Sequence, residues 1–234
     1  MRGSVVLIAV VSLAVLPAGA SNAVSLGYSD ETTIVGPGTD ACASGVLIHN
    51  HDGSFESGYA WQYSGCAPPY YGAFGEGYDL GAGTIACGAY WLSTLPGFFP
   101  PTVADCYIWE GGVGSEPGDV LAVLPGVDMG PIGLWPYVTQ HDVDMNAAVD
   151  GAFTIGYWGP WPGESSPWYF CAADESGPRG DPWTRIAPGQ GYPSGWQHPS
   201  VVWPDARSMG CGVYFEQGTP VESETWGALK SLFR

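Results

Sequence analysis

The sequence predicts an all-β protein whose antiparallel strands form a sandwich or a barrel. Three observations support this. No strong helical periodicity appears between Val24 and Gly218. Short runs of aromatic and β-branched residues occur instead, and several of them alternate with a period of two. Turn-forming clusters separate the runs, in a chain that contains 36 glycines and 21 prolines.

The chain begins with the features of a secretory signal peptide, which we assign to residues 1–23. A positive start precedes an apolar run over residues 5–16, and residues 18–20 form a small-residue cleavage site. The run is too short to span a membrane, so no stable span is expected after cleavage. The processed chain is predicted to start near Ser21 or Val24, and the protein to be secreted, either extracellular or at the cell surface.

The rest of the chain is assigned to one domain with two flanking segments. Residues 24–40 are polar and rich in glycine and are predicted to form a flexible leader. Residues 41–218 are predicted to form the β-sandwich domain, because a processed chain of about 210 residues suits one large β domain. The expected strands are Gly45–His51, Gly58–Tyr63, Tyr71–Tyr78, Thr84–Leu92, Val103–Trp109, Val120–Val123, Val138–Met145, Phe153–Trp158, Trp168–Ala173 and Met209–Glu216.

One predicted strand shows the two-residue alternation clearly. Asp105, Tyr107 and Trp109 share one face of it, opposite Cys106 and Ile108. Glycine and proline mark predicted turns over residues 111–119, 160–167 and 176–182.

The last sixteen residues change in character and are predicted to form a linker and an amphipathic tail, 219–234. Trp226, Leu229 and Leu232 fall on one face of a short C-terminal helix, acids precede it, and Lys230 and Arg234 end it. This helix either packs on the body or serves as a secretion or surface-attachment signal.

The charge balance restricts the partners. Only 6 residues are Lys or Arg and 23 are Asp or Glu, for a formal charge of −17. Nucleic-acid binding is not expected, because it requires clustered basic side chains. Adhesion to anionic membranes is disfavoured for the same reason. Acidity suits solubility outside the cell and permits divalent cation binding.

The cysteines predict one to three disulfides. Their number is even in a chain with a signal peptide, and none lies in a C-x-x-C pair, which excludes zinc ribbons. Among the strand-borne cysteines the preferred pair is Cys87–Cys211, because each precedes an aromatic strand segment. The candidates are Cys42, Cys66, Cys87, Cys106, Cys171 and Cys211.

Four segments carry a resemblance to a known group of proteins. Residues 51–61 (HDGSFESGYAW), 106–110, 116–121 and the tail 226–234 (WGALKSLFR) resemble corresponding parts of uncharacterised secreted bacterial β-sandwich proteins. The resemblance implies a jelly-roll-like antiparallel sandwich, of the kind used by carbohydrate-binding modules and surface adhesins. It implies no catalytic residues.

Two patterns suggest metal ligands. His49 and His51, followed by Glu56, have the spacing of a cupin-type metal site if they lie on a strand, and His198 follows a second cupin-like fragment. The alternative is that these are polar residues at a strand edge and turn. The sequence also offers carboxylates for calcium or, less specifically, for glycan hydrolysis; the alternative is a solvated surface. These carboxylates are Asp142, Asp144, Asp174 and Asp181.

The most specific positive signal is aromatic. The chain has 11 tryptophans and 13 tyrosines, and several fall in predicted loops, where flat rings can stack on sugars. The alternative is that these rings fill the core and clamp turns. The candidate ligand-binding residues are Trp158, Trp161, Trp168, Trp183 and Trp196.

The sequence favours a non-catalytic extracellular or cell-surface binding or structural module, with a glycan or surface polymer as its partner. It contains no G-x-S-x-G nucleophile motif and no phosphate-binding loop. Two alternatives stay open: a metal-dependent cupin-like enzyme or glycan hydrolase, and a self-assembling envelope or matrix component. No cofactor is required, with calcium as the one candidate.

Overall fold

The structure is a computed structural model, and it describes residues 23–30, 32–36, 42, 44–61, 69–97, 102–159 and 169–218. Within these residues the protein is an all-β sandwich, as the sequence predicts. The only named helical element there is a single 3-10 turn, η2 (Pro199–Val201). The predicted C-terminal helix lies outside the described residues.

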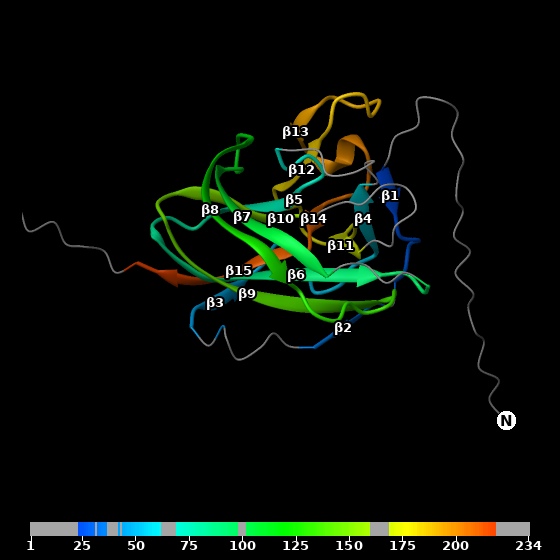
Figure 1. Cartoon of the computed structure of the whole chain (residues 1–234), viewed down its shortest axis with the longest axis horizontal. Helices are drawn as coiled ribbons and strands as arrows, with labels where there is room; N and C mark the ends of the chain where they lie inside the picture. Colours follow the sequence, from blue (N-terminus) through cyan, green and yellow to red (C-terminus); the bar gives the residue numbers. More distant parts are fainter. Residues whose placement is uncertain are drawn as a thin grey trace, which may run out of the picture.

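Two sheets form the sandwich (Figure 1). The strands of the first sheet are β1 (Ala23–Ser25), β4 (Ser57–Trp61), β11 (Tyr169–Asp174), β6 (Gly83–Thr94), β15 (Cys211–Gln217), β3 (Val46–Ile48), β9 (Tyr137–Val149), β2 (Thr33–Val35) and β14 (Ser208–Met209). The strands of the second, in spatial order, are β13 (Gly195–Gln197), β12 (Pro182–Ile186), β5 (Phe74–Asp79), β10 (Ala152–Trp158), β7 (Val103–Gly111) and β8 (Pro117–Asp128). Among the named strands, only the β2–β9 pair is parallel.

Strand β6 organises the nine-stranded sheet. It pairs with β9 through residues 83–92, with β15 through residues 83–90, and with β11 through residues 92–94. A strand has only two edges, so β15 and β11 follow one another along the same edge of β6. The junction between them lies at Gly210, whose N–H donates to Ala172 and whose carbonyl accepts from Trp91.

The core lies between the sheets and follows from the alternation of side chains. On β7, Ala104, Cys106 and Ile108 are fully buried in the main hydrophobic cluster. They meet Tyr90 and Leu92 of β6 and side chains of the other central strands in the same cluster. Removing this much apolar surface from water is the main stabilising contribution to such a fold.

The segment predicted as a flexible leader contains two strands. β1 pairs with β4, and β2 pairs with β9. Backbone hydrogen bonds to β4 and β9 hold these two short strands at the edges of the first sheet. Ala23 is the register partner of Trp61.

The structure also corrects several strand boundaries. β3 ends at Ile48, so His49 and His51 lie after the strand and not on it. β5 begins at Phe74 after a turn in which Tyr70 has a φ of 40°. β8 starts at Pro117, inside a predicted turn, and the hairpin of β12 and β13 was not expected at all.

The disulfide joins Cys42 to Cys87, with a Cα–Cα distance of 5.8 Å, so the predicted Cys87–Cys211 pair is wrong. Alternation along β6 explains why. Cys211 is the register partner of Tyr90 and faces the main core, whereas Cys87 shares its face with Ala89 and Trp91 on the other side of the sheet. Cys106, Cys171 and Cys211 are buried thiols, and Cys66 lies outside the described residues.

Candidate functional site

The two histidines of the predicted metal motif stack on each other instead of flanking an ion. Their ring centroids lie 4.0 Å apart with an interplanar angle of 16°, and His51 also packs edge-on against Trp91. The His51 side chain is buried, and burial lowers its pKa to about 3. The His51 imidazole is therefore neutral, and it packs against the rings of Phe55 and Trp91.

The other members of that motif have partners of their own. Both carboxylate oxygens of Glu56 accept hydrogen bonds, one from Ser54 and Ser176 and the other from the Glu175 backbone. The His198 ring accepts from the Ser200 backbone and so caps η2. Across the described residues, no group of three or more His, Cys, Asp or Glu side chains is arranged to hold a metal ion.

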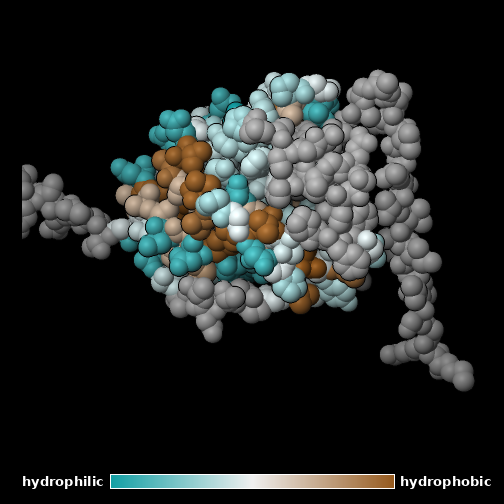
Figure 2. Space-filling view, in the orientation of Figure 1, coloured by the Kyte–Doolittle hydropathy of each residue, from teal (hydrophilic) through white to brown (hydrophobic). Residues whose placement is uncertain are grey.

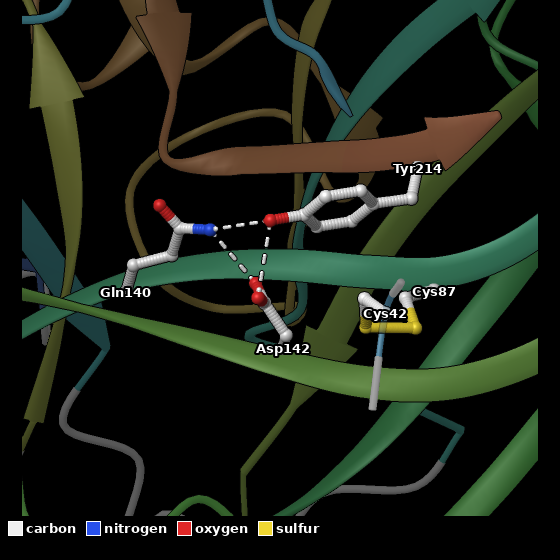
Figure 3. Close-up of a disulfide and its surroundings, with 5 residues drawn as sticks. All are labelled: Cys42, Cys87, Gln140, Asp142 and Tyr214. Carbon is white, nitrogen blue, oxygen red and sulfur yellow. Dashed lines mark hydrogen bonds between the residues drawn. A yellow bond between two sulfur atoms is a disulfide. The ribbon is translucent and has the colours of Figure 1, made fainter. Parts of the chain in front are cut away.

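Asp142 belongs to a polar network beside the disulfide, on the side of the first sheet away from the main core (Figure 3). Its carboxylate accepts from the Gln140 amide at 2.8 Å and from the Tyr214 hydroxyl at 3.1 Å. Asp144 is the register partner of Cys87 on β6 and is exposed. A groove of about 590 Å³ runs beside this part of β9, but the imidazole of His141 faces Met129 and Thr139 and not the two carboxylates.

Asp174 acts as a clamp on two loops. One of its oxygens accepts from the backbones of Ser176 and Gly177, and the other accepts from the backbone of Asp52 at 2.9 Å. Asp181 donates its backbone N–H to the buried carboxyl group of Glu76. The Asp174–Asp181 loop is thus held by internal hydrogen bonds.

Three of the five predicted tryptophans converge on one cluster. Trp158, Trp183 and Trp196 belong to the same aromatic group, whereas Trp161 and Trp168 lie outside the described residues. The group sits on the outer side of the six-stranded sheet, and we call it the aromatic face. Its rings are Tyr70, Tyr107, Trp109, Trp158, Trp183 and Trp196.

Strand alternation places these rings on one side. Tyr107 and Trp109 point away from the core because Cys106 and Ile108 point into it. Arg185 of β12 is the register partner of Trp196 of β13, so both side chains share a side of the hairpin. Trp183 and Trp196 were predicted to be loop residues, and the structure instead places them on strands.

The rings are packed closely. Tyr107 and Trp109 stack at 4.9 Å with an interplanar angle of 9°, and Trp196 meets Trp109 edge-on at 5.0 Å. Tyr70 lies 5.4 Å from Tyr107. Trp109 is fully buried and Trp196 is 5% exposed, so these two form the floor, and partly exposed Tyr107, Trp158 and Trp183 form the accessible part.

Several polar groups in the aromatic face have no hydrogen-bond partner among the described residues. The Arg185 guanidinium carbon lies 4.7 Å from the centre of the Tyr70 ring, a cation–π contact. Its Nε, and the indole N–H groups of Trp109 and Trp196, are buried and have no hydrogen-bond acceptor among the described residues. Buried donors without an acceptor reduce the stability of the folded protein.

The face continues onto β8. Val120 and Val123 are the register partners of Trp109 and Tyr107, and they are 40% and 43% exposed. Figure 2 shows hydrophobic surface gathered over the part of the molecule where β8 lies in Figure 1. β8 is also an edge strand, but three register irregularities and Pro125 interrupt it, and such features oppose edge-to-edge pairing.

Sequence reasoning missed Tyr107, Trp109 and Arg185 as site residues. The signal for the first two was present in the alternation of residues 105–109, which already placed both rings on one face. Arg185 could not be assigned without the β12–β13 hairpin, because its ring partners lie far away in the sequence.

No helix of the described residues combines the length and hydrophobicity needed to cross a membrane. No protein family model, no curated protein and no solved structure matches the chain.

Proposed function

We propose that this protein is a secreted, non-catalytic extracellular or cell-surface module that binds a glycan on the aromatic face. The observation that carries the proposal is the stacked Tyr107–Trp109 pair, backed by Trp196, on the outer side of a sheet. The Cys42–Cys87 disulfide supports an oxidising compartment outside the cytoplasm.

The chemistry of the aromatic face suits a sugar. The apolar C–H face of a pyranose ring packs on an aromatic ring, and Tyr107 offers such a ring at the accessible part. Sugar hydroxyl oxygens accept hydrogen bonds, and the guanidinium of half-buried Arg185 is a charged donor group on this face. Apolar walls with a few directed polar groups are typical of small-ligand sites.

The test is a glycan array probed with the processed chain, in calcium and in EDTA, followed by titration of any bound glycan. Tyr107→Ala should weaken binding about tenfold, equivalent to about 1.4 kcal/mol, because it removes the accessible stacking ring. Tyr137→Ala is the matched control, because Tyr137 is also a strand tyrosine, 53% exposed, on the other sheet.

Two results would contradict the proposal. An array that stays blank at high protein concentration is one, and equal loss of binding in both tyrosine variants is the other. Thermal unfolding of each variant shows that the comparison is made between folded proteins.

A further inference from the structure

Two buried cysteines meet at the junction along β6. Cys171 of β11 is the register partner of Leu92, and Cys211 of β15 is the register partner of Tyr90. Leu92 and Tyr90 are two residues apart on β6 and point to the same face. Because β11 and β15 share one edge of β6, their two cysteines occupy neighbouring positions on that edge.

The spacing of the two positions falls within disulfide geometry. Residues two apart on a strand are about 6.6–6.8 Å apart, and their partners on one edge are spaced similarly, at the upper end of the range of about 4.4–6.8 Å between Cα atoms that disulfides occupy. The chain also connects the two positions directly, because Met209 pairs with Ala173 and the Gly210 N–H donates to Ala172, one residue from each cysteine.

The two thiols also face each other. Both cysteines are fully buried in the main core. Burial raises the pKa of the Cys211 thiol well above its ordinary value, and a hydrogen bond with the Cys171 thiol raises it further. The third core thiol, Cys106, comes from the opposite sheet and hydrogen-bonds with the hydroxyl of Tyr90.

We propose that Cys171 and Cys211 form a second disulfide, across the junction of β11 and β15, while Cys106 stays a thiol. The segment between the two cysteines contains β12, η2 and β13, and therefore Trp183, Arg185 and Trp196 of the aromatic face. Between the two cysteines the chain leaves the first sheet, forms the β12–β13 hairpin in the second sheet and returns. The bond would link the two ends of this segment covalently. This inference does not depend on the identity of the ligand.

The bond forms while the chain folds, because buried thiols of raised pKa are poor nucleophiles. With glutathione disulfide as oxidant, one protein thiolate attacks a glutathione sulfur and releases one glutathione thiolate. The second protein thiolate then attacks the protein sulfur of the mixed disulfide and releases the other glutathione. Two electrons pass to glutathione, and the two thiol protons end on the two released glutathione molecules.

The proposal can be tested by mapping the disulfides after digestion at the aspartates of the chain. Cleavage before each aspartate puts all six cysteines on separate peptides: 40–51, 52–78, 79–104, 105–118, 150–173 and 205–234. The processed chain is refolded from denaturant in a glutathione redox buffer. It is then unfolded at acid pH in the presence of N-ethylmaleimide, so that buried thiols are also blocked, digested without reduction and analysed by mass spectrometry. We expect peptide 150–173 linked to 205–234, beside 40–51 linked to 79–104.

The control is Cys106→Ser, which removes the neighbouring rival thiol and should leave both links unchanged. The proposal fails if Cys171 and Cys211 carry N-ethylmaleimide in the refolded protein, or if either is linked to another cysteine peptide. Because the wild-type map decides the question, the test does not rely on a variant that fails to fold.

Discussion

At the scale of residues, Glu76 and Asp174 serve as hydrogen-bond acceptors that join separate segments of the protein. Glu76 is fully buried and accepts from the Asn50 side chain at 2.7 Å and from the backbones of Asp181 and Met209 at 2.8 Å. It thereby joins three segments that lie far apart in the sequence. Asp174 does the same for two loops, because a carboxylate satisfies several backbone donors at once.

This role predicts the effect of removing the Asp174 carboxylate. Asp174→Ala should lower the free energy of unfolding by about 2–4 kcal/mol in EDTA, because three backbone N–H groups lose their acceptor. Urea denaturation measures it. Asp181→Ala, which removes a half-buried side chain from the same loop, should cost less than about 1 kcal/mol.

A measurement in calcium can contradict this prediction for Asp174→Ala. If the Asp174 variant matches the wild type in EDTA and is less stable only when calcium is present, then the carboxylate is a cation ligand, as the sequence analysis allowed, and not a clamp.

At the scale of elements, the centre of the six-stranded sheet depends on a close approach of two strands. Gly75 of β5 and Gly156 of β10 are register partners, and Gly156 also pairs with Tyr107 of β7. A Cβ added at Gly156 would collide with the carbonyl oxygen of Phe74 and lie 2.7 Å from the Gly75 Cα. Both obstacles are backbone atoms, so relief requires the strands to move.

We therefore expect Gly156→Ala to destabilise the protein by about 3 kcal/mol, at the upper end for an overpacked site. Gly118→Ala is the control, because that glycine lies on β8 of the same sheet and its nearest obstacle is 3.5 Å away. It should change the free energy of unfolding by less than about 0.5 kcal/mol. Equal effects in urea denaturation would show that the backbone approach at Gly156 is unimportant.

The individual strands also show which parts of the fold can be predicted from sequence patterns. Alternation over residues 105–109 correctly separated the core side of β7 from the side that carries Tyr107 and Trp109. The β12–β13 hairpin escaped prediction because its strands are only five and three residues long and stand among turn residues. The Cys87–Cys211 prediction failed because a pairing depends on register and facing, which the local sequence around each cysteine does not contain.

At the scale of the whole molecule, two buried groups make stability depend on pH in opposite directions. Burial lowers the pKa of His51 from 6.5 to about 3, so the unfolded chain binds this proton first, and stability is lost as pH falls below 6.5. Burial raises the pKa of Glu76 from 4.5 to about 8, so the unfolded chain releases that proton first, and stability is lost as pH rises from 4.5 to 8.

These two effects on stability nearly cancel between pH 4.5 and 6.5. In this interval His51 is protonated only in the unfolded chain, and Glu76 is protonated only in the folded protein. Burial also lowers the pKa values of His141 and His198, which makes stability rise across this interval. Above pH 6.5 only the effect of Glu76 is left among these four groups. The free energy of unfolding should therefore be greatest near pH 6.5.

Urea denaturation from pH 4 to 8.5 tests this expectation. From pH 6.5 to 8 the wild type should lose up to about 1.4 kcal/mol per pH unit, the limit for one proton. Glu76→Gln should be less stable at every pH, because its amide group meets a backbone N–H. Its alkaline slope should disappear, and its slope between pH 4.5 and 6.5 should become steeper, because the Glu76 contribution that offsets His51 is gone. An unchanged alkaline slope in that variant would assign the loss to other groups, and Glu76 would then be ionised in the folded protein at neutral pH.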